Sequence, residues 1–206
     1  MPLHALIPIG ILIFILADPP TVAAIMTDRI LAVVNNEVIA LSDVQKYREV
    51  FLEKRGAAEA DALNALIDQA LLSAEARKLE ILPPSDDEVA RAYKKLRLRF
   101  GRPETFELLK SRLSLTDDEI ERQLKHQLMI HKLVEQRINF FVFVAPEEIE
   151  AYDQEHPGEF KNQTPESIRK AIQEILTAKK SESKLTDYLG RLRAKADIRI
   201  NRPLPE

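Results

Sequence analysis

The sequence predicts a mainly α fold with one small β-sheet. Apolar residues recur at the spacing of amphipathic helices through most of the 206 residues. Runs rich in β-branched residues, with the alternation typical of strands, stand near the start and the end of the chain. Gly is scarce, with 5 residues, which disfavours folds that need many tight turns or phosphate-binding loops.

The first 24 residues have the layout of a secretory signal peptide. Residues 6–16 are nearly all apolar, residues 18–20 (DPP) stop a helix, and the small residues 22–24 suit cleavage after Ala24. The apolar run is shorter than the roughly 20 residues that cross a bilayer. Because this N-terminus has His4 but no Lys or Arg, an uncleaved anchor is the alternative. Cleavage predicts a periplasmic protein, and an anchor predicts one held in the inner membrane and facing the periplasm.

Composition excludes several kinds of site. The chain has no Cys, so disulfides, thiolate metal sites and Cys nucleophiles are ruled out, and the fold must rest on its hydrophobic core. The net charge of -3 gives no electrostatic reason to expect nucleic acid as a partner.

The first strands and helix are predicted from residues 28–56. Two β-branched runs flank Asn35-Asn36, and Asn tolerates the positive φ of a tight turn, so a hairpin is expected. Ser42 with Gln45 has the spacing of a capping box and is expected to open a helix that fades at Gly56.

Five more helices follow from apolar spacing, capping boxes and prolines. Ser85 with Glu88 and Thr116 with Glu119 are capping boxes. The helix after Thr116 is apolar over a wide arc, so we expect it to be the longest and the central one. The predicted helices span residues 60–79, 85–100, 103–113, 117–139 and 146–156.

The remaining elements are an extended apolar stretch at residues 140–144, a final helix from Thr164-Pro165, and a strand at residues 196–200 (ADIRI). An isolated strand needs a partner. Since the other clear strands stand near the N-terminus, we expect the two ends of the mature chain to meet in one small sheet.

These segments carry a family resemblance. Residues 28–44, DRILAVVNNEVIALSDV, resemble the opening of SurA-like periplasmic chaperones and of the peptidyl-prolyl isomerases that share their N-terminal domain. The likeness continues through residues 62–81, 117–138 and 144–160, and the last part resembles the C-terminal helix and strand of that family. The resemblance implies a multi-helix SurA-type module, with a chaperone domain at residues 25–160 and a C-terminal helix and strand, residues 161–206, that complete the same core.

The resemblance departs from the family at one point. In the full-length relatives, one or more parvulin-type isomerase domains follow the segment that here ends at Phe160. Only residues 161–166 separate it from the final helix, and chains below about 40 residues rarely fold unaided. The resemblance thus implies the client-binding module with its catalytic domain missing, and we expect no enzyme.

The residues themselves point to no catalytic, metal or cofactor site. His126 and His131 are five apart, whereas metal-binding pairs favour spacings of three or four. His131 lies on the apolar stripe of its helix and is expected to be buried. Pairs of acids, such as Asp117-Asp118, stand in first helical turns, where carboxylates favour the macrodipole.

Client binding would use exposed aromatic and Met side chains, which offer a large and adaptable contact area. Such side chains also fill a protein's own core, which is the alternative for each of them. Residues 93–100 (YKKLRLRF) could contact lipid headgroups or nucleic acid, but Lys and Arg stems that cover a helix face are the commoner case. The client-binding candidates are Phe100, Phe106, Met129, Phe141 and Phe143.

The sequence therefore predicts an ATP-independent periplasmic chaperone without cofactors, which binds unfolded envelope or outer-membrane proteins. Two alternatives stay open: a peptidyl-prolyl isomerase, and a dedicated adaptor for the assembly of one envelope complex. Membrane contact is expected only if residues 1–24 are retained.

Overall fold

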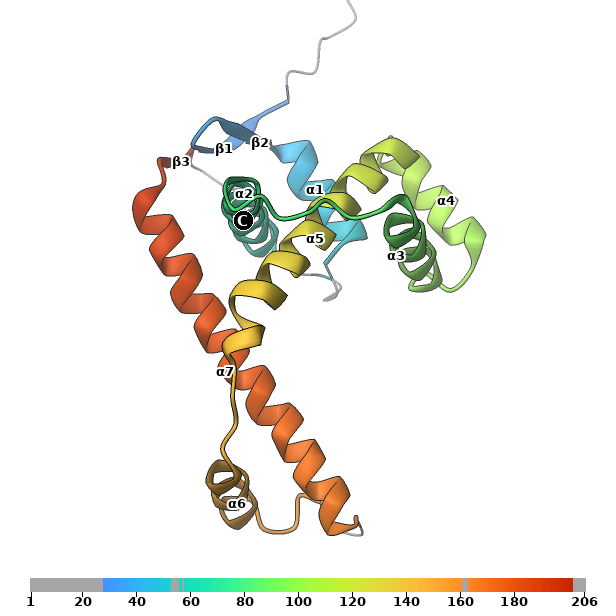
Figure 1. Ribbon diagram of the computed structural model, residues 1–206. Coiled ribbons are helices and arrows are strands. Elements are labelled where there is room, and N and C mark those ends of the chain that lie inside the picture. Colours follow the sequence, from blue (N-terminus) through green and yellow to red (C-terminus); the bar gives the residue numbers. More distant parts are fainter. Residues whose placement is uncertain (1–27, 53–55, 57, 161–162, 202–206) are drawn as a thin grey trace, which may run out of the picture.

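A computed structural model describes residues 28–52, 56, 58–160 and 163–201 (Figure 1). The segment predicted to be a signal peptide or anchor lies outside these residues. Helices dominate the described part, and one antiparallel sheet accompanies them, as predicted. The elements are β1 (Ile30–Val34), β2 (Glu37–Ala40), α1 (Leu41–Val50), α2 (Glu59–Lys78), α3 (Asp86–Leu98), α4 (Pro103–Arg112), α5 (Asp117–Arg137), the 3-10 turn η1 (Asn139–Phe141), α6 (Pro146–Glu155), α7 (Pro165–Lys195) and β3 (Ile198–Ile200).

The sheet joins the two ends of the described chain, in the strand order β2-β1-β3. Asn35 has φ of +54°, which gives the tight turn between β1 and β2. β3 is antiparallel to β1, and the Asn201 N–H donates to the Leu31 carbonyl over 2.9 Å. The predicted meeting of the N-terminal hairpin with the C-terminal strand is confirmed.

The first core lies under this sheet. α1 and α2 pack against β1 and β2, and the end of α7 approaches α2 on its way to β3 (Figure 1). Leu192, Ala196 and Ile198 of the C-terminal part pack against buried residues of the N-terminal part. The buried residues of this core are Leu31, Ala32, Val34, Ile39, Val44, Ala62, Leu63, Ile67, Ala70 and Leu71.

The start of α1 differs from the sequence prediction. The helix begins at Leu41, and the Asp43 carboxylate accepts from the N–H of Ala40 over 2.9 Å. Ser42 donates from its hydroxyl and its N–H to Asp28, so the predicted cap formed by Ser42 and Gln45 is wrong. β2 runs directly into α1, which leaves no room for a cap two residues later. The helix ends at Val50, short of the predicted Gly56.

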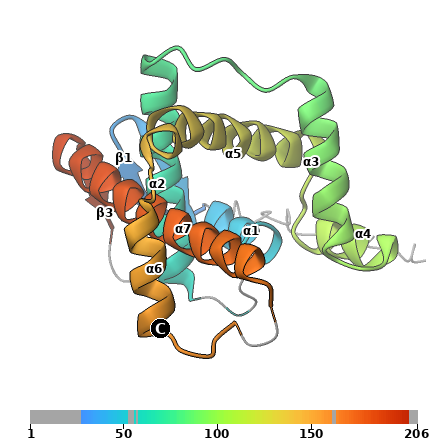
Figure 2. The ribbon, with the colours of Figure 1, turned by 60° about the horizontal axis from the view of Figure 1, so that its bottom comes forward.

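α3, α4 and the first half of α5 form an arm with its own core. The arm stands apart from the sheet and α7 (Figure 2). It joins the rest of the molecule through α5 and through the end of α1, whose Val50 is buried in the arm core. Ser85 and Thr116 cap α3 and α5 as predicted, each accepting from the N–H three residues on. The buried residues of the arm core are Val50, Val89, Leu96, Phe106, Leu115, Ile120 and Leu124.

α5 is central, but it is not the longest helix. It has 21 residues and contacts α2, α3 and η1, whereas α7 has 31 residues. The predicted extended stretch at residues 140–144 begins instead as the 3-10 turn η1 and becomes extended at Val142. Beyond it, α6 packs on the first half of α7, away from the sheet (Figure 1).

Glu119 makes the arm sensitive to acid. Its carboxylate accepts from the Lys46 ammonium and from the Thr116 N–H, each over 2.8 Å, and these bonds lower its pKa to about 2. A carboxyl group whose pKa is lowered by folding stabilises the folded state at pH values above its ordinary pKa. That contribution is lost as the pH falls through the pKa of the group in the folded state. We therefore expect Glu119→Gln to be less stable than the native chain at pH 7, with the difference shrinking as pH falls below 4.5 and vanishing only below about pH 2. Urea unfolding across this range tests this, and a constant difference between the two proteins would contradict it.

Candidate functional site

Three phenylalanines lie exposed on the segment that connects α5 to α6. Phe140, Phe141 and Phe143 are 80%, 62% and 74% exposed, and the rings of the first two meet edge to face at 5.2 Å. We call these three residues the phenylalanine strip. Burying a Phe side chain is worth about 1.5–3 kcal/mol, so three exposed rings within residues 140–143 leave a large apolar contact surface unused.

The backbone of the strip is held while its rings stay free. From α7, the Lys184 ammonium donates to the carbonyl of Phe141 over 2.7 Å, and Lys180 donates to that of Phe143 over 2.8 Å. Lys180 also binds the Glu148 carboxylate over 2.6 Å. The side chains of α7 thus satisfy the carbonyls of an irregular segment and fix it in place.

Glu148 connects the strip to α6. Its carboxylate accepts from the Ala145 N–H over 2.8 Å, at the start of the helix. The hydrogen bond from Lys180, followed by that from Ala145, lowers the pKa of Glu148. One lysine and one glutamate therefore tie together the strip, the start of α6 and α7.

The predicted client-binding residues do not form one surface. Phe141 and Phe143 lie together in the strip, and Phe140 was missed, although it stands in the same aromatic run. Phe106 is fully buried between Tyr93 and Phe100, at centroid distances of 6.1 and 5.1 Å, so its assignment as a contact residue is wrong.

Phe100 and Met129 lie elsewhere. Met129 packs against the buried residues Leu72, Ala76, Ile81 and Leu133 where α2, α5 and α7 meet. Phe100 is half-buried and lines a groove of about 680 Å³ between α1 and α4. Leu108, 73% exposed, lies in the same groove, and an ion pair between Arg112 and Glu49 stands there too. This is a second apolar surface, separate from the strip.

The histidines occupy different environments. His126 is partly buried beside β2, and burial lowers its pKa. His131 is exposed, with Nδ1 4.0 Å from Glu135, so its predicted burial is wrong. α5 changes partners along its length: Ile120 and Leu124 pack in the arm, and Leu133 packs towards α2 and α7. The stripe through Ile120 therefore meets solvent at His131, just past the arm, although Ile138 further along it is buried.

No metal site is visible in the part of the chain that the structure describes: nowhere there do three His, Asp or Glu side chains gather as ligands. In the same residues, no helix has the length and apolar composition needed to span a bilayer.

Comparison with known proteins gives one kind of match. No family model matches the chain, and neither does a curated protein. A solved structure of the SurA-like chaperones of Campylobacter jejuni, the virulence factor PEB4 and the periplasmic protein Cj1289, is similar to it. The match has a TM-score of 0.54 and 13% sequence identity, and it covers 85% of this chain and 100% of that one. The chain has the fold of SurA-like chaperones.

Proposed function

We propose that the protein is a periplasmic, ATP-independent chaperone that holds unfolded envelope proteins, including outer-membrane proteins, through the phenylalanine strip. The observation that carries the proposal is the exposure of three phenylalanines within residues 140–143 on a fixed backbone. The fold supports it, because the similar solved structure is one of SurA-like chaperones, of which Cj1289 is described as periplasmic.

The chemistry of the strip suits clients without a defined sequence. Aromatic rings bind apolar and aromatic side chains with little geometric demand, and an unfolded chain exposes many of these. A few rings give modest affinity, since ordering a flexible client costs free energy at the moment of binding. Such binding is reversible without nucleotide hydrolysis, so that the client can leave to fold or to insert.

The proposal includes no isomerase activity. Only residues 161–164 lie between Phe160 and α7, which is too short a segment for a catalytic domain. We expect the rate of proline isomerisation in a model peptide to equal that in buffer. A rate above that of buffer would contradict this part of the proposal.

The experiment is suppression of aggregation when a denatured outer-membrane protein is diluted into buffer. We expect Phe140→Ser combined with Phe143→Ser to raise the amount of chaperone needed about tenfold or more, because half-burial of two rings is worth at least ~1.4 kcal/mol. Light scattering measures the effect, and circular dichroism shows that the variant is folded.

Leu82 provides a matched control, since it is 76% exposed on the segment between α2 and α3, against 74% for Phe143. We expect Leu82→Ser to leave suppression unchanged and Phe143→Ser alone to weaken it. Equal losses in these two single variants would mean that the strip has no special role.

A further inference from the structure

We infer that the tip of the α3–α4 arm docks on an anionic phospholipid surface. We call this surface the basic tip; it comprises Arg91, Lys94, Lys95, Arg97, Leu98 and Arg102. It would give the protein a membrane contact that does not depend on residues 1–24 and that is separate from the phenylalanine strip.

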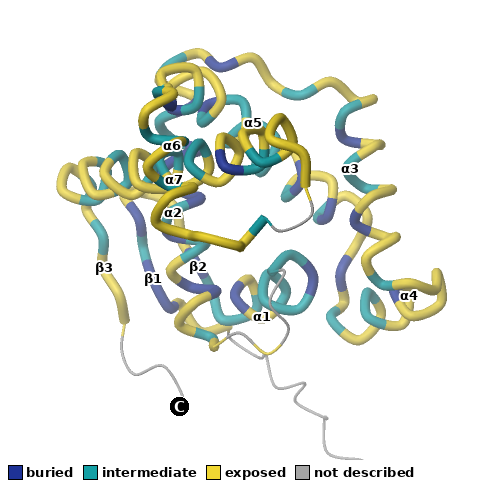
Figure 3. The backbone as a smooth tube through the Cα atoms, turned by 90° about the horizontal axis from the view of Figure 1, so that it is seen from below, coloured by how far each residue is buried: buried dark blue, intermediate teal, exposed yellow. Residues whose placement is uncertain are grey.

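The first observation is a local excess of positive charge. Residues 91–102 (RAYKKLRLRFGR) contain six Lys and Arg and no acid, in a chain of net charge -3. All six are exposed (Figure 3 shows the outer stretch of the arm). Among the described residues, Arg91, Lys94, Lys95, Arg97 and Arg102 form no ion pair, whereas Lys110 of α4 pairs with Glu107 and Asp117. The nearest acid along the chain is Glu104, at the start of α4.

The second observation is an apolar residue among the cations. Arg91, Lys95 and Leu98 follow one another at spacings of four and three, and Lys94 stands three residues after Arg91 and four before Leu98, so the four share one face of α3, opposite the buried Leu96. Leu98 is 69% exposed. A leucine flanked by basic side chains is the pattern of helices that lie on membranes, where the cations meet headgroups and the apolar residue enters the acyl boundary.

The helix macrodipole explains part of the charge but not this pattern. Lys95 and Arg97 stand in the last turn of α3, where cations are favourable. Arg91 and Lys94 stand earlier in the helix and need another reason. The macrodipole also gives no reason for the exposed Leu98 beside these cations.

A cavity beside Leu98 offers room for a headgroup. It measures about 490 Å³, lies between the last turns of α3 and the start of α4, and is lined by Tyr93, Lys94, Arg97, Leu98 and Pro103. Two cations on one cavity suit a phosphate group, which carries negative charge and several acceptor oxygens.

The position of the basic tip keeps the two surfaces apart. α5 begins next to the arm and ends next to the strip, as Figure 1 shows. Its 21 residues span on the order of 30 Å at about 1.5 Å per residue. A molecule held by its arm on a membrane would therefore keep the strip available to a client.

The test is co-sedimentation of the full chain with vesicles of phosphatidylcholine alone or mixed with phosphatidylglycerol. We expect Lys94→Gln, Arg97→Gln and Arg102→Gln together to lower affinity for the mixed vesicles on the order of a hundredfold at low salt, because each basic residue near an anionic surface contributes about fivefold. Leu98→Ser should weaken binding to the mixed vesicles further. Added salt should weaken the binding of the native chain to the same vesicles.

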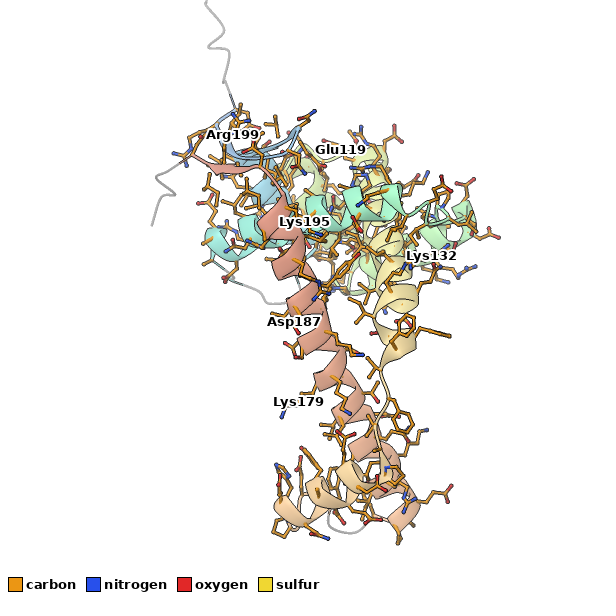
Figure 4. All side chains as sticks on the ribbon, turned by 60° about the vertical axis from the view of Figure 1, so that its left-hand side comes forward. Glu119, Lys132, Lys179, Asp187, Lys195 and Arg199 are labelled. Carbon is orange, nitrogen blue, oxygen red and sulfur yellow. The ribbon has the colours of Figure 1, made fainter. Side chains whose placement is uncertain are left out.

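Three exposed cations of α7, replaced as Arg169→Gln, Lys170→Gln and Lys179→Gln, give a control with the same change in net charge; Figure 4 shows Lys179 pointing away from the body of the molecule. We expect this control to bind mixed vesicles like the native chain. Equal losses in the two triple variants, or equal binding to both kinds of vesicle, would overturn the inference. Tighter binding to a short DNA duplex than to mixed vesicles would also overturn it.

Suppression of aggregation by the basic-tip variant separates this inference from the proposed chaperone function. The variant should suppress aggregation as the native chain does, since the phenylalanine strip is untouched. Loss of suppression without loss of vesicle binding would mean that the basic tip serves clients instead, and the membrane inference would then be wrong.

Discussion

Phe106→Ala is expected to lower the free energy of unfolding by about 3–5 kcal/mol, the range for removing a buried aromatic ring. Phe106 is fully buried, and both Tyr93 and Phe100 pack against its ring. Typical domains are stable by only about 5–15 kcal/mol, so the change would remove a large share of the total.

The loss should be concentrated in the arm. Phe106 is the buried side chain of α4, and the Lys110 ammonium lies 5.8 Å from its ring centroid while binding Asp117 of α5 over 2.5 Å. Removing the ring leaves a cavity between α3 and α4, and α4 has few contacts with other elements that could hold it in place. Hydrogen exchange should therefore show the amides of α3 and α4 losing protection before those of α2.

Phe143→Ala provides the comparison. Its ring is 74% exposed, and substitutions at such positions change stability by about 0.5 kcal/mol or less. Urea unfolding of the two variants tests the assignment of Phe106 to the core and of Phe143 to the surface. Similar changes in the two variants would contradict both assignments.

Signals that act within a few residues were predictable from the sequence. The caps at Ser85 and Thr116 need only the carboxylate and N–H three residues away, and both form. The predicted cap at Ser42 does not form, because the Ser42 hydroxyl donates to Asp28, 14 residues earlier in the chain. The Asp43 carboxylate caps the helix instead. A local rule holds where no residue from elsewhere competes.

The burial of individual side chains was less predictable from the sequence, because it depends on which helix packs against each of them. Phe106 and Phe143 are the same residue type, and Phe143 has the more apolar neighbours in sequence, yet Phe106 is covered by α3 and Phe143 is 74% exposed. His131 lies on the apolar stripe of α5 that contains Ile120. The arm does not extend along α5 as far as His131, so this side chain stays exposed. The lysines of α7 that fix the strip are about 40 residues away along the chain, and no local pattern links them to it.

A chain ending at residue 164 is expected to lose cooperative folding. The deletion removes α7 and β3, and with them one strand of the sheet and the helix that packs on α2. Ile172 of α7 is fully buried, and Leu185, Leu189, Leu192 and Ile198 pack, partly buried, against the cores; an aliphatic side chain of this size contributes up to about 1.5–3 kcal/mol when fully buried. The sum is comparable with the stability of a typical domain.

Polar contacts add to this loss. The Arg193 guanidinium binds the Asp68 carboxylate of α2 over 2.6 Å, and the Tyr188 hydroxyl donates to Glu75 over 3.2 Å. The Asn35 N–H donates to the Asp197 carbonyl over 2.7 Å. Without α7 and β3, the hairpin is a two-stranded sheet with an open edge, which is marginal in water.

A peptide of residues 163–206 should restore the fold when it is added to the truncated chain. The helix α7 contacts the rest of the chain through side chains, and β3 pairs with strand β1, so these contacts do not require the covalent connection. Circular dichroism and urea unfolding, with and without the peptide, measure the rescue. An Arg193→Ala peptide should rescue at a higher concentration, since Asp68 would lose its partner. A truncated chain that unfolds cooperatively by itself would show that residues 28–160 form an independent core, and the C-terminal helix and strand would then be an addition to the domain and not a part of it.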